Sequence, residues 1–238
     1  MLPRLAQIAE EMLGIKLTPL QLRMFHTYSE ELQAWNEKVN LTAITEPEAI
    51  EVRHFADSLT TLMVMRPRTP GLRVIDVGTG AGFPGIPLKI VCPAIELTLV
   101  EATGKKVDFL QHIVETLKLG PVTLVNERVE TIGQMPEHRE QYDWALARAV
   151  ASMNTLMEYL LPLVKVGGHA LAMKGESGPQ ETSEAQEAIR LLGGRLVQLT
   201  PVELPTVAET RYLVDVEKIA QTPPKYPRRP GMPNKRPL

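Results

Sequence analysis

The stretch Asp76–Gly82, DVGTGAG, decides the fold of this chain. The apolar run Leu72–Ile75 before it is typical of a buried strand, and Phe83–Ile90 behind it carries prolines that suit the first turn of a helix. Glycines at alternate positions let the backbone turn tightly and let a ligand approach without meeting a Cβ. The helix N-terminus behind the loop favours negative charge. Strand, glycine loop and helix together predict a binding site for a nucleotide-type cofactor.

Two cofactor classes fit this loop. Gly80, Gly82 and Gly85 have the G-x-G-x-x-G spacing of dinucleotide sites, with Glu101 at a suitable distance to bind a ribose. The other interpretation is D-x-G-x-G-x-G, the loop typical of S-adenosylmethionine (SAM) methyltransferases, in which Asp76 ends the strand and faces the cationic amino-acid end of the cofactor. Because NAD and SAM both carry a ribose, Glu101 does not discriminate between them.

Length, charge and cysteine content narrow the class of protein. The 238 residues suit one α/β domain with an extension. Lys and Arg total 26 and Asp and Glu total 28, so the overall charge does not indicate a polyanionic partner. Cys92 is the single cysteine, which excludes a disulfide framework and indicates a reducing compartment. Without a signal-peptide pattern or a membrane-spanning apolar run, we expect a cytoplasmic protein that does not associate with a membrane.

The pattern of residues divides the chain into three parts. Residues 1–70 are predicted to form a helical N-terminal extension, with a capping box at Thr18–Gln21. The segment 66–71, RPRTPG, breaks the helical pattern and marks the boundary. Residues 71–220 form the cofactor-binding domain, and residues 221–238 form a proline-rich tail with five basic and no acidic side chains. Such a tail either is solvated or follows phosphates.

Alternating strand and helix patterns predict a mostly parallel, doubly wound α/β sheet. Strands are expected at 72–77, 96–101, 122–127, 142–147 and 169–174. Two last runs, 195–204 and 211–219, have no helix between them and predict an antiparallel pair. The expected architecture is a seven-stranded sheet with a terminal antiparallel hairpin and a ligand site at the carboxyl ends of its strands. The hairpin favours SAM over a dinucleotide.

Polar side chains at the carboxyl ends of the strands form the candidate site. Glu101 ends the second strand, and Asn126–Glu130 follows the third, where an adenine edge is expected. Arg148 follows the fourth strand, where the substrate and the reactive end of a cofactor would meet. Its structural alternative is an ion pair with an acid such as Asp143. Lys174, after the fifth strand, either faces the same cleft or is solvated.

The chain contains no evident catalytic base. It lacks an Asn-Pro-Pro-Tyr motif for amino-group methylation, a Pro-Cys nucleophile for pyrimidine C5 and an H-x-E…C-x-x-C zinc site. Its five histidines are scattered, and we expect no metal site. An acceptor that already has a free lone pair needs no base. Guanine N7 is such an acceptor, and its methylation loses no proton, so binding and alignment can carry the catalysis.

Segments spread along nearly the whole chain are far more specific than the glycine loop. They are Trp35–Thr42, Arg53–Leu59, Asp76–Leu88 (with GFPGIPL), Val100–Glu101, Lys105–Lys106, Phe109–Leu110, Ala147–Ala151, Lys174–Gly175 and Lys225–Gly231 (KYPRRPG). With these segments the chain resembles the RsmG (GidB) methyltransferases. The resemblance implies a Rossmann-like class I SAM-dependent fold. It also implies an enzyme that transfers a methyl group from SAM to N7 of a guanine in the 530 loop of 16S rRNA.

The resemblance also implies roles for individual residues. The SAM contacts of the family carry over to Gly78, Phe83, Val129, Glu130 and Arg148, and the loop and strand-end arguments above add Asp76, Gly80 and Glu101 as cofactor residues. The family usually has Ala at the position of Val129, where a backbone contact would survive the change. Phe83 either forms a wall of the cofactor site or packs onto the next helix. Arg148 is expected to be the catalytic residue, which orients the target guanine or its phosphate. RNA contacts are expected from Asn36, Asn40, Arg53, His54, Lys174, Lys225, Arg228, Arg229, Lys235 and Arg236.

The expected partner is 16S rRNA, naked or in the 30S subunit, and the expected state is a monomer without metal. Three other functions remain open at this point. An NAD-dependent oxidoreductase would bind NAD and not SAM. A non-catalytic ribosome-assembly protein would bind SAM and RNA without turnover. A SAM enzyme acting on another RNA or a small molecule would transfer the methyl group elsewhere.

Overall fold

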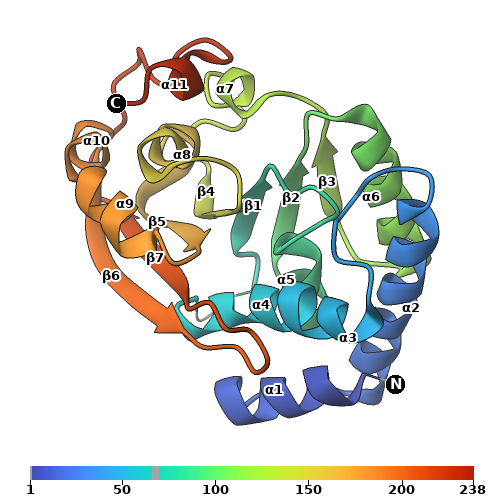
Figure 1. Ribbon diagram of the computed structural model, residues 1–238. Coiled ribbons are helices and arrows are strands. Elements are labelled where there is room, and N and C mark those ends of the chain that lie inside the picture. Colours follow the sequence, from blue (N-terminus) through green and yellow to red (C-terminus); the bar gives the residue numbers. More distant parts are fainter. Residues whose placement is uncertain (1, 66–69) are drawn as a thin grey trace.

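A seven-stranded sheet forms the centre of the computed structural model, which describes residues 2–65 and 70–238 (Figure 1). The strands are β1 Arg73–Val77, β2 Glu96–Val100, β3 Val122–Val125, β4 Tyr142–Arg148, β5 Val164–Lys174, β6 Gly194–Val202 and β7 Arg211–Lys218. Their order is β3-β2-β1-β4-β5-β7-β6. The pairs from β3 to β5 are parallel, whereas β7 runs antiparallel to both β5 and β6. The predicted mostly parallel sheet with a terminal antiparallel hairpin is confirmed.

Helices cover both faces of this sheet (Figure 1). The first face is covered by α1 Pro3–Leu13, α2 Pro19–Asn36, α3 Pro47–Ile50, the π-helical turn η1 Glu51–Ala56, α4 Asp57–Leu59, the 3-10 turn η2 Thr60–Met63, α5 Gly85–Val91 and α6 Gly104–Thr116. The second face is covered by α7 Val129–Ile132, α8 Met153–Leu160, α9 Gly178–Glu184 and α10 Gln186–Leu191. A short helix near the C-terminus, α11 Met232–Lys235, lies beside α7 and α8 (Figure 1).

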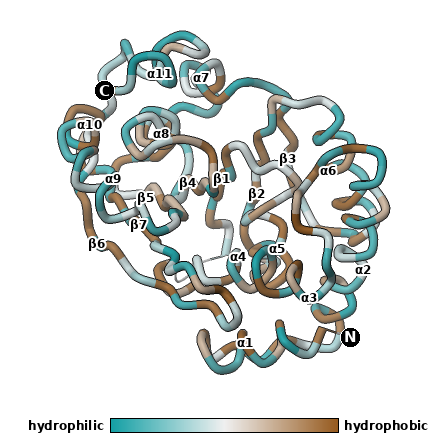
Figure 2. Tube along the Cα trace, in the orientation of Figure 1, coloured by the Kyte–Doolittle hydropathy of each residue, from teal (hydrophilic) through white to brown (hydrophobic). Residues whose placement is uncertain are grey.

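Alternation along the strands creates a hydrophobic core on each face. In β5, Leu171 and Met173 belong to the first core, whereas Ala170 and Ala172 belong to the second. Successive strand residues point to opposite faces, which explains why nearly continuous apolar runs in the sequence form two cores. Figure 2 shows the apolar residues gathered on the central strands, while the chain around α11 is mostly hydrophilic.

The predicted capping box begins α2. The Thr18 side chain accepts a hydrogen bond from the Gln21 N–H at 3.2 Å, and the Gln21 side chain accepts one from the Thr18 N–H at 2.9 Å. The helix buries Phe25 and Tyr28 in the first core. The expected boundary at 66–71 falls largely on residues 66–69, which lie outside the described residues. Among the described helices, none has the length and apolar character needed to cross a membrane.

β5 is longer than the predicted strand 169–174. It begins at Val164, which pairs with Tyr142, and resumes pairing at His169 opposite Trp144. The four residues between form a bulge that contains Gly167 and Gly168. A Cβ on Gly168 would lie 2.7 Å from the Asp143 carbonyl oxygen, so glycine is needed where the bulge meets β4. Two adjacent glycines are typical of a loop, although here they lie inside β5.

Candidate active site

The predicted glycine loop follows β1 directly and leads into α5. The Gly78 and Thr79 N–H groups both donate to the Val100 carbonyl at the end of β2, at 2.9 and 3.1 Å. Gly78 and Gly80 have φ values of 65° and 61°, in the left-handed region that favours glycine. A Cβ on Gly78 would also lie 2.8 Å from a methyl group of Val150. Glycine at position 78 therefore lets the loop after β4 approach β1.

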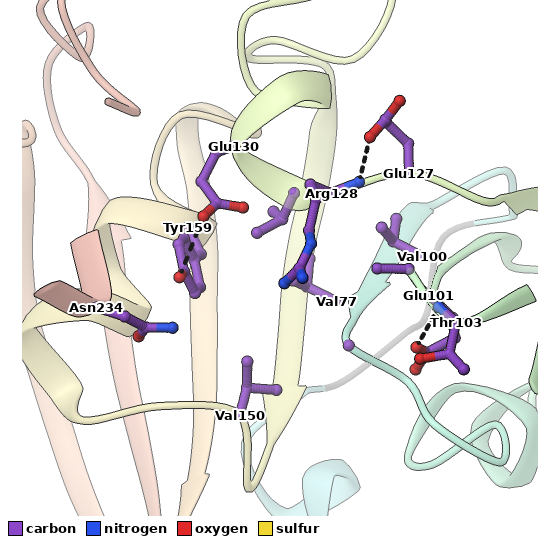
Figure 3. Close-up of a pocket in the computed structure, with 13 residues that line it drawn as sticks. Val77, Val100, Glu101, Thr103, Glu127, Arg128, Glu130, Val150, Tyr159 and Asn234 are labelled. Atoms are coloured by element: carbon purple, nitrogen blue, oxygen red, sulfur yellow. Dashed lines mark hydrogen bonds between the residues drawn. The ribbon is translucent and has the colours of Figure 1, made fainter. Parts of the chain in front are cut away.

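A cavity of about 270 Å³ opens beside this loop, and we call it the glycine-loop cavity. It lies at the carboxyl ends of β1, β2 and β3, where the sequence predicted a ligand site. Figure 3 shows its walls, which come from the strand ends, α7, α8 and α11. Its lining includes Gly78, Glu101, Val129, Glu130, Tyr159 and Asn234.

Glu101 holds the floor of the glycine-loop cavity together. One carboxylate oxygen accepts a hydrogen bond from the Gly80 N–H at 3.1 Å, and the other accepts one from the Thr103 N–H at 2.8 Å. The carboxylate therefore bridges the glycine loop and the start of α6. Each carboxylate oxygen can accept more than one hydrogen bond, so Glu101 can still bind hydroxyl groups of a ligand.

The side chain of Asp76 lies in the protein interior and accepts hydrogen bonds from the glycine loop and the start of α5. It is fully buried, and its Oδ2 accepts hydrogen bonds from the Thr79 hydroxyl at 2.6 Å and the Gly85 N–H at 2.8 Å. Burial raises the pKa of Asp76 to about 6, against the lowering effect of these two bonds. Its Oδ1 has no hydrogen-bond partner among the described residues. Asp76 does not line the glycine-loop cavity, and its first role is to fix the loop to α5.

Val129 and Glu130 begin α7 and line the same cavity. The buried carboxylate of Glu130 accepts a hydrogen bond from the Gly231 N–H at 2.8 Å and one from the Tyr159 hydroxyl at 3.4 Å. Burial, and then the charge of Glu130, raise the pKa of Tyr159 to about 12, so this phenol stays protonated as a donor. Glu130 therefore connects the cavity wall to the C-terminal tail.

Arg148 ends β4, and its guanidinium group bonds to residues of the N-terminal helical extension. Its Nη1 donates to the Asp57 carboxylate at 2.8 Å and to the Arg53 carbonyl at 3.0 Å. The ion-pair alternative was correct in kind but wrong in partner, because Asp143 instead pairs with Lys165 at the other end of β4. Arg148 and Asp57 are both largely buried, which makes this a fixed pair.

His54 contacts both Arg148 and the ring of Phe83. The Arg148 Nη2 donates to His54 Nδ1 at 3.2 Å, so the ring proton lies on Nε2, which donates to the Thr42 hydroxyl at 2.8 Å. Burial, and then the nearby Arg148 charge, lower the pKa of His54 to about 3, so the imidazole is neutral near pH 7. Its ring stacks on Phe83 at 4.5 Å between centroids. His54 therefore contacts Arg148 as a neutral hydrogen-bond acceptor.

Phe83 belongs to an aromatic cluster and does not line the glycine-loop cavity. Its ring stacks on Tyr28 with centroids 5.4 Å apart, and the Arg148 guanidinium carbon lies 5.0 Å from the ring centroid. The Tyr28 hydroxyl donates to the Ala81 carbonyl of the glycine loop at 2.5 Å. Phe83 therefore packs within the protein, but on Tyr28 of α2 and not on the next helix as the packing alternative had it, and it joins the loop to α2.

A second cavity, of about 280 Å³, lies on the other side of the segment Arg148–Val150, and we call it the Arg148 cavity. Arg148 and Ala149 line it, whereas Val150 lines the glycine-loop cavity. Ala149 has a φ of 56°, a conformation that is uncommon for alanine and clusters at functional sites. The turn therefore directs neighbouring side chains into two cavities. The other lining residues include Arg53, His54, Lys174, Ser177, Arg211 and Tyr212.

Cations dominate the Arg148 cavity. Lys174 is not solvated as one alternative had it: its side chain is 10% exposed, pairs with Glu181 at 2.6 Å and donates to the Ala151 carbonyl at 2.9 Å. Arg211 has a buried Nε with no hydrogen-bond partner among the described residues. In the described ranges, no group of three or more His, Cys, Asp or Glu side chains is arranged to hold a metal ion.

The other expected RNA contacts in the N-terminal region differ in their surroundings. The Asn36 side chain accepts from the Leu41 and Thr42 N–H groups at 2.8 and 2.9 Å and donates to the Thr42 carbonyl. It therefore shapes the chain after α2. Asn40 is exposed, and Arg53 is half-buried at the rim of the Arg148 cavity.

The C-terminal tail is docked, so its description as a solvated segment is wrong. Tyr226 is buried, and Arg139 donates to the Tyr226 carbonyl at 2.7 Å and the Thr222 carbonyl at 2.8 Å. Arg228 pairs with Glu158, which is 0% exposed, through four hydrogen bonds of 2.5 to 3.1 Å. The basic residues that remain on the surface are Lys225, Arg229, Lys235 and Arg236.

Comparison with known proteins places the chain in a family. The GidB family model, described as rRNA small subunit methyltransferase G, matches residues 21–208. The chain belongs to the GidB family. A relative from Roseiflexus castenholzii, named Ribosomal RNA small subunit methyltransferase G, is 51% identical over 225 residues, which are 94% of this chain and 95% of the relative. A relative of the same name from Alkaliphilus metalliredigens is 48% identical over 226 residues, 95% of this chain and 94% of its own.

Solved structures support the fold of this GidB family member. A SAM-dependent methyltransferase from Aquifex aeolicus has a TM-score of 0.54 at 18% identity and covers 73% of this chain and 94% of its own. TrmN from Thermus thermophilus has a TM-score of 0.54 at 16% identity, and the match covers 79% of this chain and 53% of TrmN. At such identities the likeness concerns the fold alone, which is that of class I SAM-dependent methyltransferases.

Sequence reasoning missed several residues of the two cavities. Arg128 extends into the glycine-loop cavity from the segment after β3, which was expected to lie near an adenine (Figure 3). Tyr159 and Asn234 come from α8 and α11, and no local motif indicated that either faces a ligand site. Asp57 lay within a family-like segment, but nothing in the sequence paired it with Arg148.

Proposed function

We propose that this protein transfers the methyl group of SAM to N7 of a guanine in the 530 loop of 16S rRNA. The observation that supports this best is the pair of cavities on opposite sides of Arg148–Val150. One has the glycine loop and acids of a nucleoside site, and the other has cations and lacks an available base. Transfer of a methyl group between two bound ligands needs such an arrangement.

The glycine-loop cavity suits SAM. Glu101 can accept hydrogen bonds from the ribose hydroxyls, and Val129 offers an apolar surface for the adenine. Gly78 and Gly80 leave the loop open to the methionine part, and a Cβ on Gly80 would meet nothing within 4 Å. The unpartnered Oδ1 of Asp76 adds negative potential beneath the loop. SAM would supply an electrophilic methyl group, while these residues bind and orient it.

The Arg148 cavity suits the guanine and its flanking phosphates. Guanine presents the acceptors O6 and N7 on one edge, and arginine is their commonest partner. Arg211 and Arg53 line this cavity, and the buried Nε of Arg211 has no hydrogen-bond partner among the described residues. Arg148 is held by Asp57 and His54, so it acts as a fixed orienting group. Because N7 methylation releases no proton from the ring, the absence of a free base is consistent with this acceptor.

The exposed basic residues suit an RNA backbone. Lys225, Arg229, Lys235 and Arg236 on the tail would contact phosphates, together with the half-buried Arg53 and the exposed amide of Asn40 on the N-terminal side. Arg228, Lys174, Asn36 and His54, whose polar groups bond within the protein, would support such contacts indirectly. Phosphate contacts with single-stranded RNA predict a log–log salt slope of about −0.7 for each phosphate.

The proposal assigns a role to each part of the chain. Residues 71–220 bind SAM, residues 1–70 form the helical extension that holds Arg148, and residues 221–238 form the basic tail. The protein acts in the cytoplasm as a monomer on 16S rRNA or the 30S subunit, without a metal. An NAD-dependent oxidoreductase is not favoured by the family, and a non-catalytic assembly protein differs from the proposal by the lack of turnover.

Methyl transfer from labelled SAM tests the proposal directly. The acceptors are 30S subunits and naked 16S rRNA that both lack the modification, and the products are mapped for 7-methylguanine. Label at one guanine of the 530 loop is the expected result, and the better acceptor shows the assembly stage. SAM binding without label in either RNA would contradict the assignment and favour the non-catalytic alternative.

A further inference from the structure

Hydrogen bonds and an ion pair attach the C-terminal tail to the helices that border the glycine-loop cavity. Arg228 pairs with the fully buried Glu158 of α8, and the Thr155 hydroxyl of the same helix donates to the Pro233 carbonyl at 3.1 Å. Asn154 donates to the backbone carbonyl of Leu238. Three consecutive parts of the tail therefore contact one helix.

A further bond links the tail to the cavity wall itself. The Gly231 N–H donates to Glu130 at 2.8 Å, and Glu130 lines the glycine-loop cavity. Gly231 has a φ of 79°, a conformation that favours glycine, and α11 begins at the next residue. The turn at Gly231 therefore directs α11 back towards the cavity.

Asn234 of α11 lines the glycine-loop cavity (Figure 3). Figure 3 shows its amide pointing into the space that Glu101 and Thr103 border from the opposite wall. The side chain is exposed, and no hydrogen bond joins its amide to another described residue. An amide offers both donors and an acceptor, and asparagine pairs well with the edge of an adenine.

We propose that Asn234 binds the adenosyl part of SAM, so that the C-terminal tail forms a wall of the cofactor site. This inference rests on the proposed function, because it requires SAM in the glycine-loop cavity. Asn234 lies beyond residues 21–208 that the family model matches. Lys235 and Arg236 follow Asn234 and are exposed.

Calorimetric titration with S-adenosylhomocysteine tests this contact without turnover. Asn234→Ala should weaken binding about 3- to 10-fold, the range of one net hydrogen bond. The matched control is Gln221→Ala, which removes an exposed amide at the start of the same tail and away from the cavity. Wild-type affinity in Asn234→Ala would overturn the inference. Failure of the wild-type protein to bind would instead contradict the proposed function, so the two failures are distinguishable.

Amide hydrogen exchange provides a second readout. In the wild-type protein, S-adenosylhomocysteine should slow exchange in residues 231–238, because the ligand contacts α11. Asn234→Ala at saturating ligand should lose most of this slowing while residues 78–85 of the glycine loop keep theirs. Equal slowing of residues 231–238 in both proteins would overturn the proposed role of Asn234.

Discussion

The glycine-loop cavity and the Arg148 cavity share the segment Arg148–Val150 and are built differently. The first is formed mainly by strand ends and loops that follow them, with Glu101 bonded to backbone N–H groups. The second is formed by side chains from four distant segments, and two of its cations are paired with the carboxylates of Asp57 and Glu181.

Because the two cavities are built differently, we expect different substitutions to disrupt them. A cavity that depends on backbone geometry tolerates change in most side chains and is sensitive at the few that hold the loop. A cavity built from buried ion pairs is sensitive wherever one partner is removed, because the other charge is left buried without a counter-ion. The following changes test this contrast in decreasing order of expected effect.

Arg148→Ala should have the largest effect. It leaves the buried Asp57 carboxylate unpaired and removes the orienting group, so we expect the unfolding free energy to fall by about 3–5 kcal/mol and single-turnover methyl transfer by about 100-fold or more. Urea unfolding and rapid-quench assays at saturating SAM measure the two effects. Arg148→Lys keeps the charge without the fork geometry and should recover stability more than rate. A full rate in Arg148→Ala would remove Arg148 from the proposed mechanism.

Arg228→Ala tests whether buried ion pairs matter equally on the tail. The Glu158 side chain, which is 0% exposed, would lose its partner. We therefore expect the free energy of unfolding, measured with urea, to fall by about 3 kcal/mol. Adding Glu158→Gln removes the stranded charge and should restore part of the loss, which a double-mutant cycle quantifies. Unchanged stability in the single variant would mean that the pair does not hold the tail.

Glu101→Gln tests the backbone-built cavity. The neutral amide cannot accept from both the Gly80 and Thr103 N–H groups, so the loop and the ribose contact should both weaken. Hydrogen bonds to a charged group contribute about 1.5–3 kcal/mol, which corresponds to a loss of about 10- to 100-fold in S-adenosylhomocysteine affinity by calorimetry. The control is Glu127→Gln. Glu127 is an exposed acid at the rim of the cavity, and its carboxylate accepts a hydrogen bond from the Arg128 N–H, so this variant should lose much less affinity for S-adenosylhomocysteine. Normal affinity in Glu101→Gln would contradict the ribose role.

Asp76→Asn tests the buried acid beneath the loop through pH. The folded-state pKa of Asp76 is raised to about 6 from 3.8, so protonation favours the folded state and ionisation on raising the pH through this window opposes it. Between pH 4.5 and 7.5, wild type should therefore lose about 2 kcal/mol of unfolding free energy relative to Asp76→Asn. Urea unfolding of both proteins at both pH values measures this difference, in which other titrating groups cancel. Parallel pH profiles would contradict the raised pKa.

Arg229→Gln should have the smallest effect and differ in kind from Arg228→Ala. Arg229 is exposed, so unfolding should be unchanged, while affinity for the 16S rRNA acceptor falls a few-fold and the salt slope decreases by about 0.7. Filter binding across a salt series measures both quantities. Arg195→Gln on the edge strand β6 serves as a control for general loss of charge. An unchanged salt slope would exclude a phosphate contact at Arg229.

Local sequence determined most of the fold and half of the site. The strand pattern predicted the sheet and its terminal hairpin, and it placed Glu101 at the carboxyl end of the second strand, at the same edge of the sheet as the glycine loop. These features follow from neighbouring residues, because strand periodicity and the carboxyl-end rule need no distant contact. The length of β5 was predicted less accurately, because the bulge at Gly167–Gly168 depends on its fit against β4.

Only the tertiary structure decided how the charges are used. Arg148 pairs with Asp57 and not with Asp143, because packing of the N-terminal helices brings a distant carboxylate to the end of β4. Arg228 and Arg229 are adjacent and chemically identical, yet one is bonded to a buried acid and the other is exposed. Composition reports that a segment is basic, whereas burial and partners decide whether each cation stabilises the protein or remains available to a ligand. That distinction requires the fold.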